Sequence, residues 1–323
     1  MPGFDPRWKD VPDYIHGITE DIWEKRHIHA LKDYYADDII VRSPATVVQG
    51  NKGVIAATLA TLAEWPDREL PGEDVIWCGH AEEGTLFSSH RLICSATHTH
   101  PGAYGAPTGA KLRYRILADC AIRDNQVYDE WLVRDQGAIV RQMGMDPLAF
   151  ARDQIAREEG KEACVKPLTP ANDKPARYTT SGNTTETGSH YADLLTRIMG
   201  AEISVININY DRAAQLEYPG GVPALGPKGA SEFWIGLRAS FPNAQFKIDH
   251  VVGNEEAGRP NRAALRWSLH GKHEGWGTFG APSQADVYIL GISHAEFGPR
   301  GLHREYVLFD EVAIWKQIVL QKG

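Results

Sequence analysis

The sequence repeats itself at a spacing of about 175 residues, and this repeat constrains the fold more than any other feature. The string Gly-Ala-Pro-Thr at 105–108 returns as Gly-Ala-Pro-Ser at 280–283. Further pairs match in the same register without a gap: His98 with His273, Glu130 with Glu305, Trp131 with Tyr306, and Asp135 with Asp310. Because chance agreement of so many Gly, Pro, His and acidic positions is improbable, we expect a tandem duplication of one module.

The length of the chain agrees with two copies of a domain. Its 323 residues exceed the usual single domain of roughly 100–200 residues. We predict a first domain at 1–145, a connection at 146–189 and a second domain at 190–323. The connection should begin with a short amphipathic helix and continue as a flexible linker, because residues 165–189 are rich in Pro, Thr, Ser, Gly and Asn.

Composition and charge exclude several classes of protein. The formal net charge is −8 and no Lys/Arg cluster is present, which argues against nucleic-acid binding. The N-terminus has no apolar signal region, and no stretch is apolar enough to cross a bilayer, so we expect no membrane association. The four cysteines show no CxxC spacing and are interpreted as reduced structural thiols in a cytoplasmic protein. A small molecule is the expected partner.

Each copy is predicted to contain helices first and strands afterwards. Apolar residues at helical spacing predict one helix over 13–35, with Asp13 as its N-cap, and a second helix between Gly53 and Trp65. Asp124-Asn125 is a turn signal between two strands, which therefore form a hairpin. The predicted strands are 75–78, 86–98, 112–122 and 127–134. This order is typical of an α+β domain.

The strand at 112–122 alternates between apolar and polar residues. Its apolar face should be covered, whereas the face that carries Asp119 should be exposed to solvent. The matching strand at 287–297 is apolar on both faces, which indicates that its outer face is buried. We therefore expect the modules to pair with each other within the chain or through a homodimer.

The loop at 98–109 carries a resemblance to a known family. His98, Gly105, Thr108 and Gly109 match the loop pattern of SnoaL-like polyketide cyclases, members of the NTF2-like superfamily. The segment 123–131 is similar to the hairpin that follows that loop in the same family. The resemblance implies two NTF2-like cone-shaped modules, each a curved antiparallel sheet wrapped around N-terminal helices, with a mostly apolar cavity at the mouth.

The same resemblance implies a chemistry and shows where this chain departs from it. Polyketide cyclases of this family condense their substrate without a metal, using an Asp as acid and base with the help of histidines. That Asp position falls on Leu132 in the first copy and on Val307 in the second. The neighbouring histidine position falls on Glu130 and Glu305, and an early Asn becomes Ser43. The family's own acid/base group is therefore missing.

Glu130 and His98 are the candidate catalytic residues of the first module. A carboxyl group in apolar surroundings has a raised pKa and can act as a general acid or base near neutral pH. The alternative is that Glu130 is a rim residue paired with Arg115 or Arg134. Likewise, His98 could be a catalytic partner or could hydrogen-bond the Gly-Pro loop closed.

Further residues are expected around the two pockets. The candidates for substrate binding in the first module are His100, Tyr14, Tyr34, Tyr114, Ser43, Leu132 and Trp131. A parallel pocket in the second module would use His273, Glu305 and Trp234. The spacing of His98 and His100 also suits a pair of zinc ligands on a strand, but we expect no metal and no cofactor.

Three functions follow from these residues. The first is a cofactor-independent acid/base enzyme, similar to a lyase, isomerase or cyclase, that acts on a small, largely apolar carbonyl or hydroxyl compound. The second is a protein that binds a small molecule without catalysis, or a scaffold. The third is a zinc-dependent lyase or hydrolase that uses the His98/His100 pair. In each case we expect one working pocket in the first module, with the second module as its structural partner.

Overall fold

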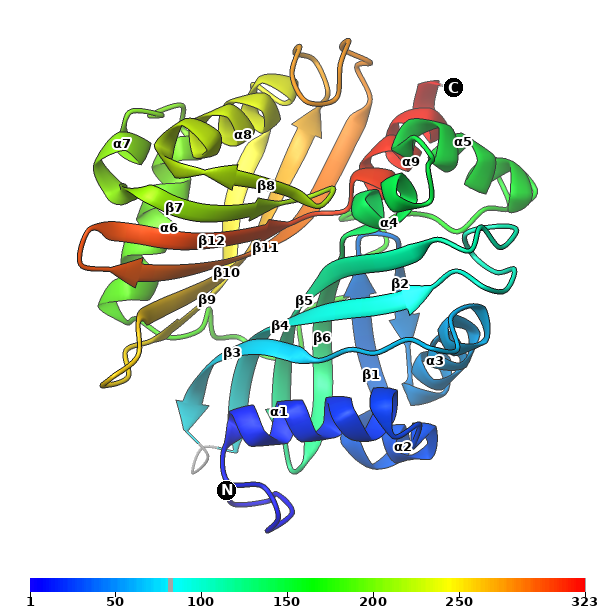
Figure 1. Ribbon diagram of the computed structural model, residues 1–323, viewed down its shortest axis with the longest axis vertical. Helices are drawn as coiled ribbons and strands as arrows, with labels where there is room; N and C mark the ends of the chain where they lie inside the picture. Colours follow the sequence, from blue (N-terminus) through cyan, green and yellow to red (C-terminus); the bar gives the residue numbers. More distant parts are fainter. Residues whose placement is uncertain (81–83, 323) are drawn as a thin grey trace.

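The computed structural model describes residues 1–80 and 84–322 and contains two six-stranded sheets (Figure 1). We call the part of the chain that carries β1–β6 the first module and the part that carries β7–β12 the second. The strand orders, β2-β1-β6-β5-β4-β3 and β8-β7-β12-β11-β10-β9, are the same. The strands of the first module are β1 (Tyr35–Ser43), β2 (Thr46–Gln49), β3 (Gly72–His80), β4 (Thr85–Thr97), β5 (Lys111–Arg123) and β6 (Gln126–Arg134). Those of the second are β7 (Tyr210–Tyr218), β8 (Val222–Leu225), β9 (Gln245–Asn254), β10 (Asn261–Lys272), β11 (Asp286–Gly298) and β12 (Gly301–Leu308).

The α+β class and the four predicted strands of the first module, β3 to β6, are confirmed. Asp124 and Asn125 both adopt positive φ angles of 50° and 65°, as the tight hairpin between β5 and β6 requires. The expectation of a wholly antiparallel sheet is wrong in one pair of each module. Strands β1 and β6 run parallel, and so do β7 and β12, so both sheets are mixed.

The predicted single helix at 13–35 is broken into short pieces. Helix α1 (Val11–Thr19) is capped by Asp10, whose side chain accepts a hydrogen bond from the Asp13 amide. A π-helical turn (Glu20–Glu24), a 3-10 turn (Ile28–Ala30) and α2 (Leu31–Tyr34) follow. The break has a local cause, because Arg26 adopts a φ of 60°, which lies outside the right-handed helical region.

The remaining helices cover the inner faces of the sheets or fill the junction between them (Figure 1). Helix α3 (Asn51–Glu64) lies beside β1 and β2, and α8 (Gly226–Ser240) takes the same place in the second module. Two further helices, α6 (Glu186–Met199) and α7 (Val205–Asn209), complete the second cone. The junction holds α4 (Gln136–Gln142), α5 (Pro147–Arg157) and α9 (Glu311–Lys322), of which α5 and α9 pack together.

The outer faces of the two sheets pack against each other within one chain. One apolar cluster joins strands of both modules; it consists of Leu117, Trp131, Val133, Leu168, Leu290, Ile292 and Leu308. The buried outer face of β11 is therefore confirmed, and its partner is the first module. The prediction for Asp119 was wrong. It was expected to face solvent, but it is 2% exposed and pairs with His250 and Arg266 of the second module.

A single asparagine joins the edges of the two sheets. The Trp77 amide on β3 donates a hydrogen bond to Asn254 Oδ1 on β9 over 2.8 Å. Asn254 Nδ2 donates in return to the Trp77 carbonyl over 2.7 Å. The side-chain amide of Asn254 thus makes the two bonds that a neighbouring strand would make.

The connection between the modules is anchored, so the expectation of a flexible linker is wrong. Arg42, whose side chain is fully buried, donates hydrogen bonds to Asp173 Oδ1 over 2.8 Å and to two linker carbonyls. The ring of Tyr178 packs edge-on against Phe87, at a centroid distance of 4.8 Å. Leu168 is buried between the sheets. The linker sequence is poor in apolar residues, but these few contacts hold it.

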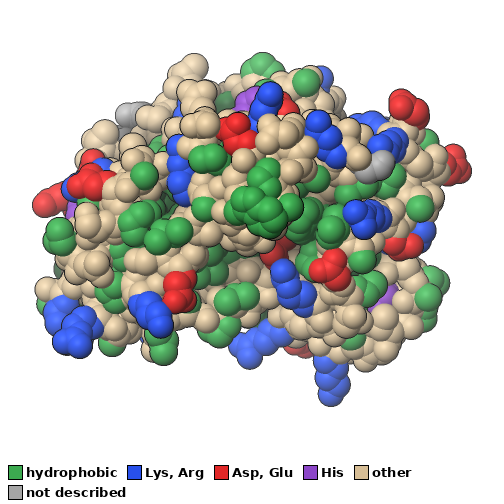
Figure 2. All heavy atoms as spheres, turned by 90° about the horizontal axis from the view of Figure 1, so that it is seen from above, with side chains coloured by type: hydrophobic (Ala, Val, Ile, Leu, Met, Phe, Trp, Pro, Cys, Tyr) green, Lys and Arg blue, Asp and Glu red, His purple; other side chains and the backbone are tan. Residues whose placement is uncertain are grey.

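The surface shows no strong segregation of charge on the face in Figure 2, where Lys and Arg side chains lie scattered among acidic ones. Within residues 1–80 and 84–322, no helix is long and apolar enough to cross a membrane.

Candidate functional site

A cavity of about 440 Å³ lies at the mouth of the first module. Helix α3, the β1–β2 turn, strand β6 and the loop that follows β4 form its walls. The wall is mostly apolar and includes Trp23, Val41, Val48, Val54, Trp65 and Leu132. A cavity of this size and lining suits a small, largely apolar molecule.

Arg134 is the basic residue in the wall of this cavity. It follows Leu132 by two residues on β6, so both side chains point to the same side of the sheet and line the cavity. Its Nε is buried without a hydrogen-bond partner, and among the described residues no carboxylate forms an ion pair with its guanidinium. A half-buried guanidinium without a carboxylate partner is a binding group for an anion or a polarised carbonyl oxygen.

Glu64 also borders the cavity, but its contacts point inward to the loop at 98–109. Its carboxylate accepts hydrogen bonds from the amides of Ala103 and Tyr104, over 3.1 and 2.9 Å. In the second module, Ser240 accepts a hydrogen bond from the amide of Phe279 at the matching place. Since the bond recurs without the carboxylate, we interpret Glu64 as the residue that holds the loop in place.

His98 closes the same loop and is fully buried. Its Nδ1 accepts a hydrogen bond from the Thr108 amide over 3.3 Å, so the proton of the neutral ring is on Nε2, which lies 3.4 Å from Glu64 Oε1. The matching His273 contacts Ser283 over 3.0 Å. Of the two roles that the sequence left open for His98, this geometry favours closure of the Gly-Pro loop.

Glu130 is buried in the core of the first module and is not among the residues that line the cavity. Burial raises the pKa of its carboxyl group to about 7. It pairs with Cys120 on β5, whereas Thr97, the neighbour of His98, pairs with Lys111. Nine residues of β5 separate these positions, or about 30 Å of extended strand. The structure therefore does not bring Glu130 and His98 together.

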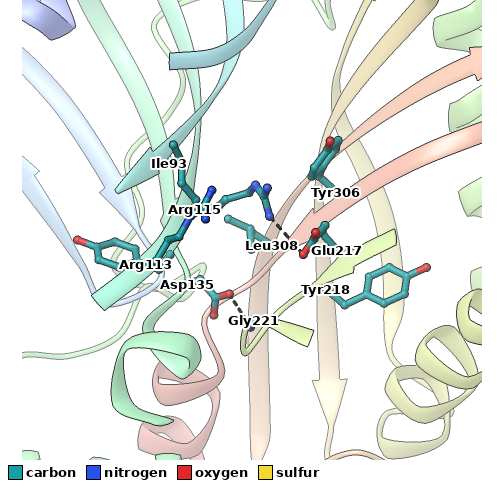
Figure 3. A pocket seen from close by; sticks show the side chains of 10 residues that line it. Ile93, Arg113, Arg115, Asp135, Glu217, Tyr218, Gly221, Tyr306 and Leu308 are labelled. Atoms are coloured by element: carbon teal, nitrogen blue, oxygen red, sulfur yellow. Dashed lines mark hydrogen bonds and ion pairs between the residues drawn. The ribbon is translucent and has the colours of Figure 1, made fainter. Parts of the chain in front are cut away.

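The proposed rim pairing of Glu130 is wrong as well. Arg115 pairs with Glu73 over 2.8 Å and with Glu217 of the second module over 3.3 Å. Figure 3 shows this second ion pair across the cleft between the modules.

Two of the predicted substrate-binding residues, Ser43 and Leu132, line the cavity. Trp131 does not, because it points to the outer face, where the guanidinium groups of Arg42 and Arg266 contact its ring at 4.1 and 3.5 Å from the centroid. His100 is exposed on the loop surface and contacts Thr99.

The three tyrosines predicted for the cavity also lie elsewhere. The Tyr14 hydroxyl donates to the Asn125 carbonyl over 2.9 Å, and the Tyr34 hydroxyl donates to Asp21 over 3.0 Å. Tyr114 is buried beside Arg68. All three belong to the packed core, and the sequence analysis was wrong to assign them to the cavity.

The second module has no parallel open pocket around Glu305. The carboxylate of Glu305 accepts hydrogen bonds from the hydroxyl groups of Tyr191, Tyr210 and Tyr218, over 3.0, 2.8 and 2.8 Å. Trp234 and His273 are fully buried. Large aromatic residues replace smaller or polar ones at four matching positions: Tyr218 for Ser43, Phe233 for Ala57, Trp234 for Thr58 and Phe309 for Arg134. These rings take up space that is open in the first module, and a cavity of about 520 Å³ that is lined by Tyr218, Phe233 and Phe309 among others remains beside them.

One residue of the second module lines the cavity of the first. Asp310 is 2% exposed and accepts hydrogen bonds from the Ala313 amide and from Gln136 Nε2, each over 3.1 Å. Burial raises its pKa to about 7. The sequence signal was the recurrence of Asp135 at Asp310, which indicated a role at the end of the last strand but not a position beside a cavity.

A metal site is not assembled. In the described ranges, no group of three or more His, Cys, Asp or Glu side chains is arranged to hold a metal ion. His98 is buried with its Nδ1 bonded to the loop, whereas His100 is exposed, so the two rings do not form the predicted pair of ligands.

Comparison with known proteins shows which family the first module is similar to. A family model described as SnoaL-like polyketide cyclase matches residues 14–143. Residues 14–143, most of the first module, are therefore similar to this family. No curated protein matches the chain in a sequence search. The second module, which the family model does not match, shares the strand order of the first.

Three solved structures are similar to part of the chain. IdmH from Streptomyces antibioticus is 19% identical, with 42% of this chain and 98% of that chain covered and a TM-score of 0.36. A SnoaL-like protein from Jannaschia sp. CCS1 is 13% identical, with 43% of this chain and 94% of that chain covered and a TM-score of 0.37. TsrD from Streptomyces laurentii is 17% identical, with 42% of this chain and 94% of that chain covered and a TM-score of 0.36.

Proposed function

We propose that the SnoaL-like cavity binds a small, largely apolar compound with a carbonyl or acidic hydroxyl group and catalyses proton transfer on it without a cofactor. The observation that carries this proposal is the Arg134 guanidinium, which lies in an apolar cavity without a carboxylate partner. Such a cation stabilises the negative charge that develops on oxygen when a carbonyl compound enolises. Cyclisation, isomerisation and elimination of small carbonyl compounds all pass through such a state.

Two related proposals concern the whole chain. We propose that it is a tandem duplication with domains at 1–145 and 190–323 joined by 146–189, supported by the repeated strand order. We further propose that it works in the cytoplasm, since Cys78, Cys94, Cys120 and Cys164 are all free and buried, as in a reducing compartment.

Binding can be tested with a matched pair of probes, 2-naphthoate and 2-acetylnaphthalene. They share one apolar body and differ in whether the oxygen group is an anion or a ketone. We expect titration calorimetry to show binding of 2-naphthoate, and R134M to weaken it at least about tenfold, since a charge-assisted hydrogen bond is lost. The control R152M changes an exposed arginine on α5 and should leave the affinity unchanged. Equal affinities in wild type and R134M would contradict the assignment of Arg134.

Catalysis can be tested by the exchange of the methyl protons of 2-acetylnaphthalene in deuterium oxide, followed by NMR. An acid/base cavity should speed this exchange above the rate in buffer, because exchange requires the enol or enolate. R134M should return the rate toward the buffer value.

A second candidate function is binding without catalysis. Leu132 favours it, because an apolar residue stands where the resemblance expects the acid/base Asp. This candidate predicts that 2-acetylnaphthalene binds while its methyl protons exchange at the buffer rate.

A further inference from the structure

The cavity of the first module is completed by the second, at a place where the two halves of the chain are not equivalent. Asp135 and Asp310 occupy matching positions, each before the helix that follows the last strand of its module. Each caps that helix, since Ala138 and Ala313 donate their amides to them, over 3.0 and 3.1 Å. Up to this point the two residues have the same role.

Their remaining contacts differ. Asp135 accepts two further hydrogen bonds, from the amides of Gly220 and Gly221 in the β7–β8 turn, over 2.8 and 3.0 Å. Figure 3 shows the carboxylate of Asp135 facing Gly221 across the cleft between the modules. This turn closes over Asp135 and uses both of its oxygens. The hydrogen bonds of Asp135 therefore connect the two modules.

The corresponding turn of the first module does not close over Asp310. The Thr46 amide, which matches the Gly221 amide, donates to Ser43 within its own turn over 3.2 Å. Asp310 instead accepts a side-chain hydrogen bond from Gln136. Residues 43–46 and Asp310 both line the cavity, so the space that the turn fills at Asp135 stays open at Asp310.

We propose that Asp310, supplied by the second module, is the group that exchanges a proton with the ligand in the cavity of the first module. This inference rests on the proposed function. Arg134 and Asp310 line the same cavity, so a ligand oxygen can face both. The protonated carboxyl gives its proton to the carbonyl oxygen of the ligand while a solvent water molecule takes the α-proton from carbon, which forms the enol; the reverse transfers return both protons. The group suits this exchange at neutral pH, because burial raises its pKa to about 7.

The test measures proton uptake when 2-naphthoate binds to the full-length protein at pH 7.5 (an assay condition, about half a unit above the Asp310 pKa). Titration calorimetry in phosphate and in Tris, which differ in ionisation enthalpy, gives the number of protons taken up. The anionic probe next to Asp310 should raise the pKa of that carboxyl, so wild type should take up a substantial fraction of one proton. D310N should take up almost none, whereas the control E130Q should behave as wild type, because Glu130 titrates in the same range outside the cavity.

The outcomes separate this inference from the proposed function. Binding with unchanged proton uptake in D310N overturns the role of Asp310 and leaves the cavity intact. Absence of binding to wild type overturns the proposed function and this inference with it. If D310N does not fold, infrared difference spectroscopy on wild type decides. A protonated-carboxyl band should grow when 2-naphthoate binds, and a spectrum without it overturns the inference.

Discussion

Asp119 Oδ2 on β5 lies 2.9 Å from Arg266 Nε on β10, and this buried ion pair joins the two halves of one chain. His250 Nδ1 lies 3.0 Å from the same carboxylate. Burial alone would raise the pKa of Asp119, but its contacts with His250 and Arg266 hold that pKa below its ordinary value. The modules are thus joined by charge as well as by apolar packing.

Removal of this charge should destabilise the protein strongly. D119N leaves Arg266 buried without its carboxylate, which costs about 3–5 kcal/mol in comparable buried pairs. The free energy of unfolding in urea measures this loss. D153N, which breaks an exposed pair with Arg157 on α5, should cost less than about 1 kcal/mol. If the two variants unfold at the same urea concentration, the ion pair does not stabilise the junction.

Glu130 should make the protein less stable as the pH rises. Its pKa is about 7 in the folded state, above the ordinary carboxyl value of 4.5, so the folded protein holds a proton that the unfolded chain releases. The free energy of unfolding therefore falls between about pH 4.5 and 7 and stays lower above that range. E130Q should remove this term and be more stable than wild type at pH 8 by up to about 3 kcal/mol. A parallel pH dependence of wild type and E130Q would show that Glu130 does not titrate in this way.

Replacing Ala57 by phenylalanine, the residue at the matching position of the second module, should fill the cavity of the first module. Ala57 lines the cavity, and the matching Phe233 stacks on Tyr218 at a centroid distance of 3.8 Å. We expect A57F to fold with near wild-type stability and to lose 2-naphthoate binding at least about tenfold. A56F, one position along α3 and outside the lining, is the matched control. Retained binding in A57F would place the probe elsewhere.

The linker should become accessible to protease when its anchor is removed. R42M deletes the hydrogen bonds from Arg42 to Asp173 and to the linker carbonyls and also removes the buried ion pair with Asp129, so openings that expose the linker should become at least about ten times more frequent. Chymotrypsin cleavage after Tyr178 reports this opening. R152M should be cleaved at the wild-type rate. Equal rates in R42M and wild type would mean that other contacts hold the linker.

The sequence was sufficient for much of the fold because its signals there are local. Strand-like runs of residues located β3 to β6, and Asp124-Asn125 located the hairpin between β5 and β6. Strands β1 and β2 were missed because Asp37 and Asp38 interrupt the apolar pattern of β1 and β2 is short. The internal repeat predicted the two matching sheets.

The site was harder to predict because its residues come from distant parts of the chain. The family resemblance marked Glu130 and Leu132 as positions of interest, but it could not show that the cavity begins at Leu132 and extends to Arg134. Asp119 was misassigned because a charge on an alternating strand signals solvent unless the opposing surface is known. The position of Asp310 depends on the packing of one module on the other.

The Asn254 side chain has a consequence for how copies of this protein meet one another. A sheet edge with free amides and carbonyls invites a strand from another molecule, which is a common route to aggregation. Asn254 occupies the Trp77 amide and carbonyl on the β3 edge. It therefore protects that position from the addition of a strand from another molecule. The two sheets can thus lie side by side without promoting the growth of fibres.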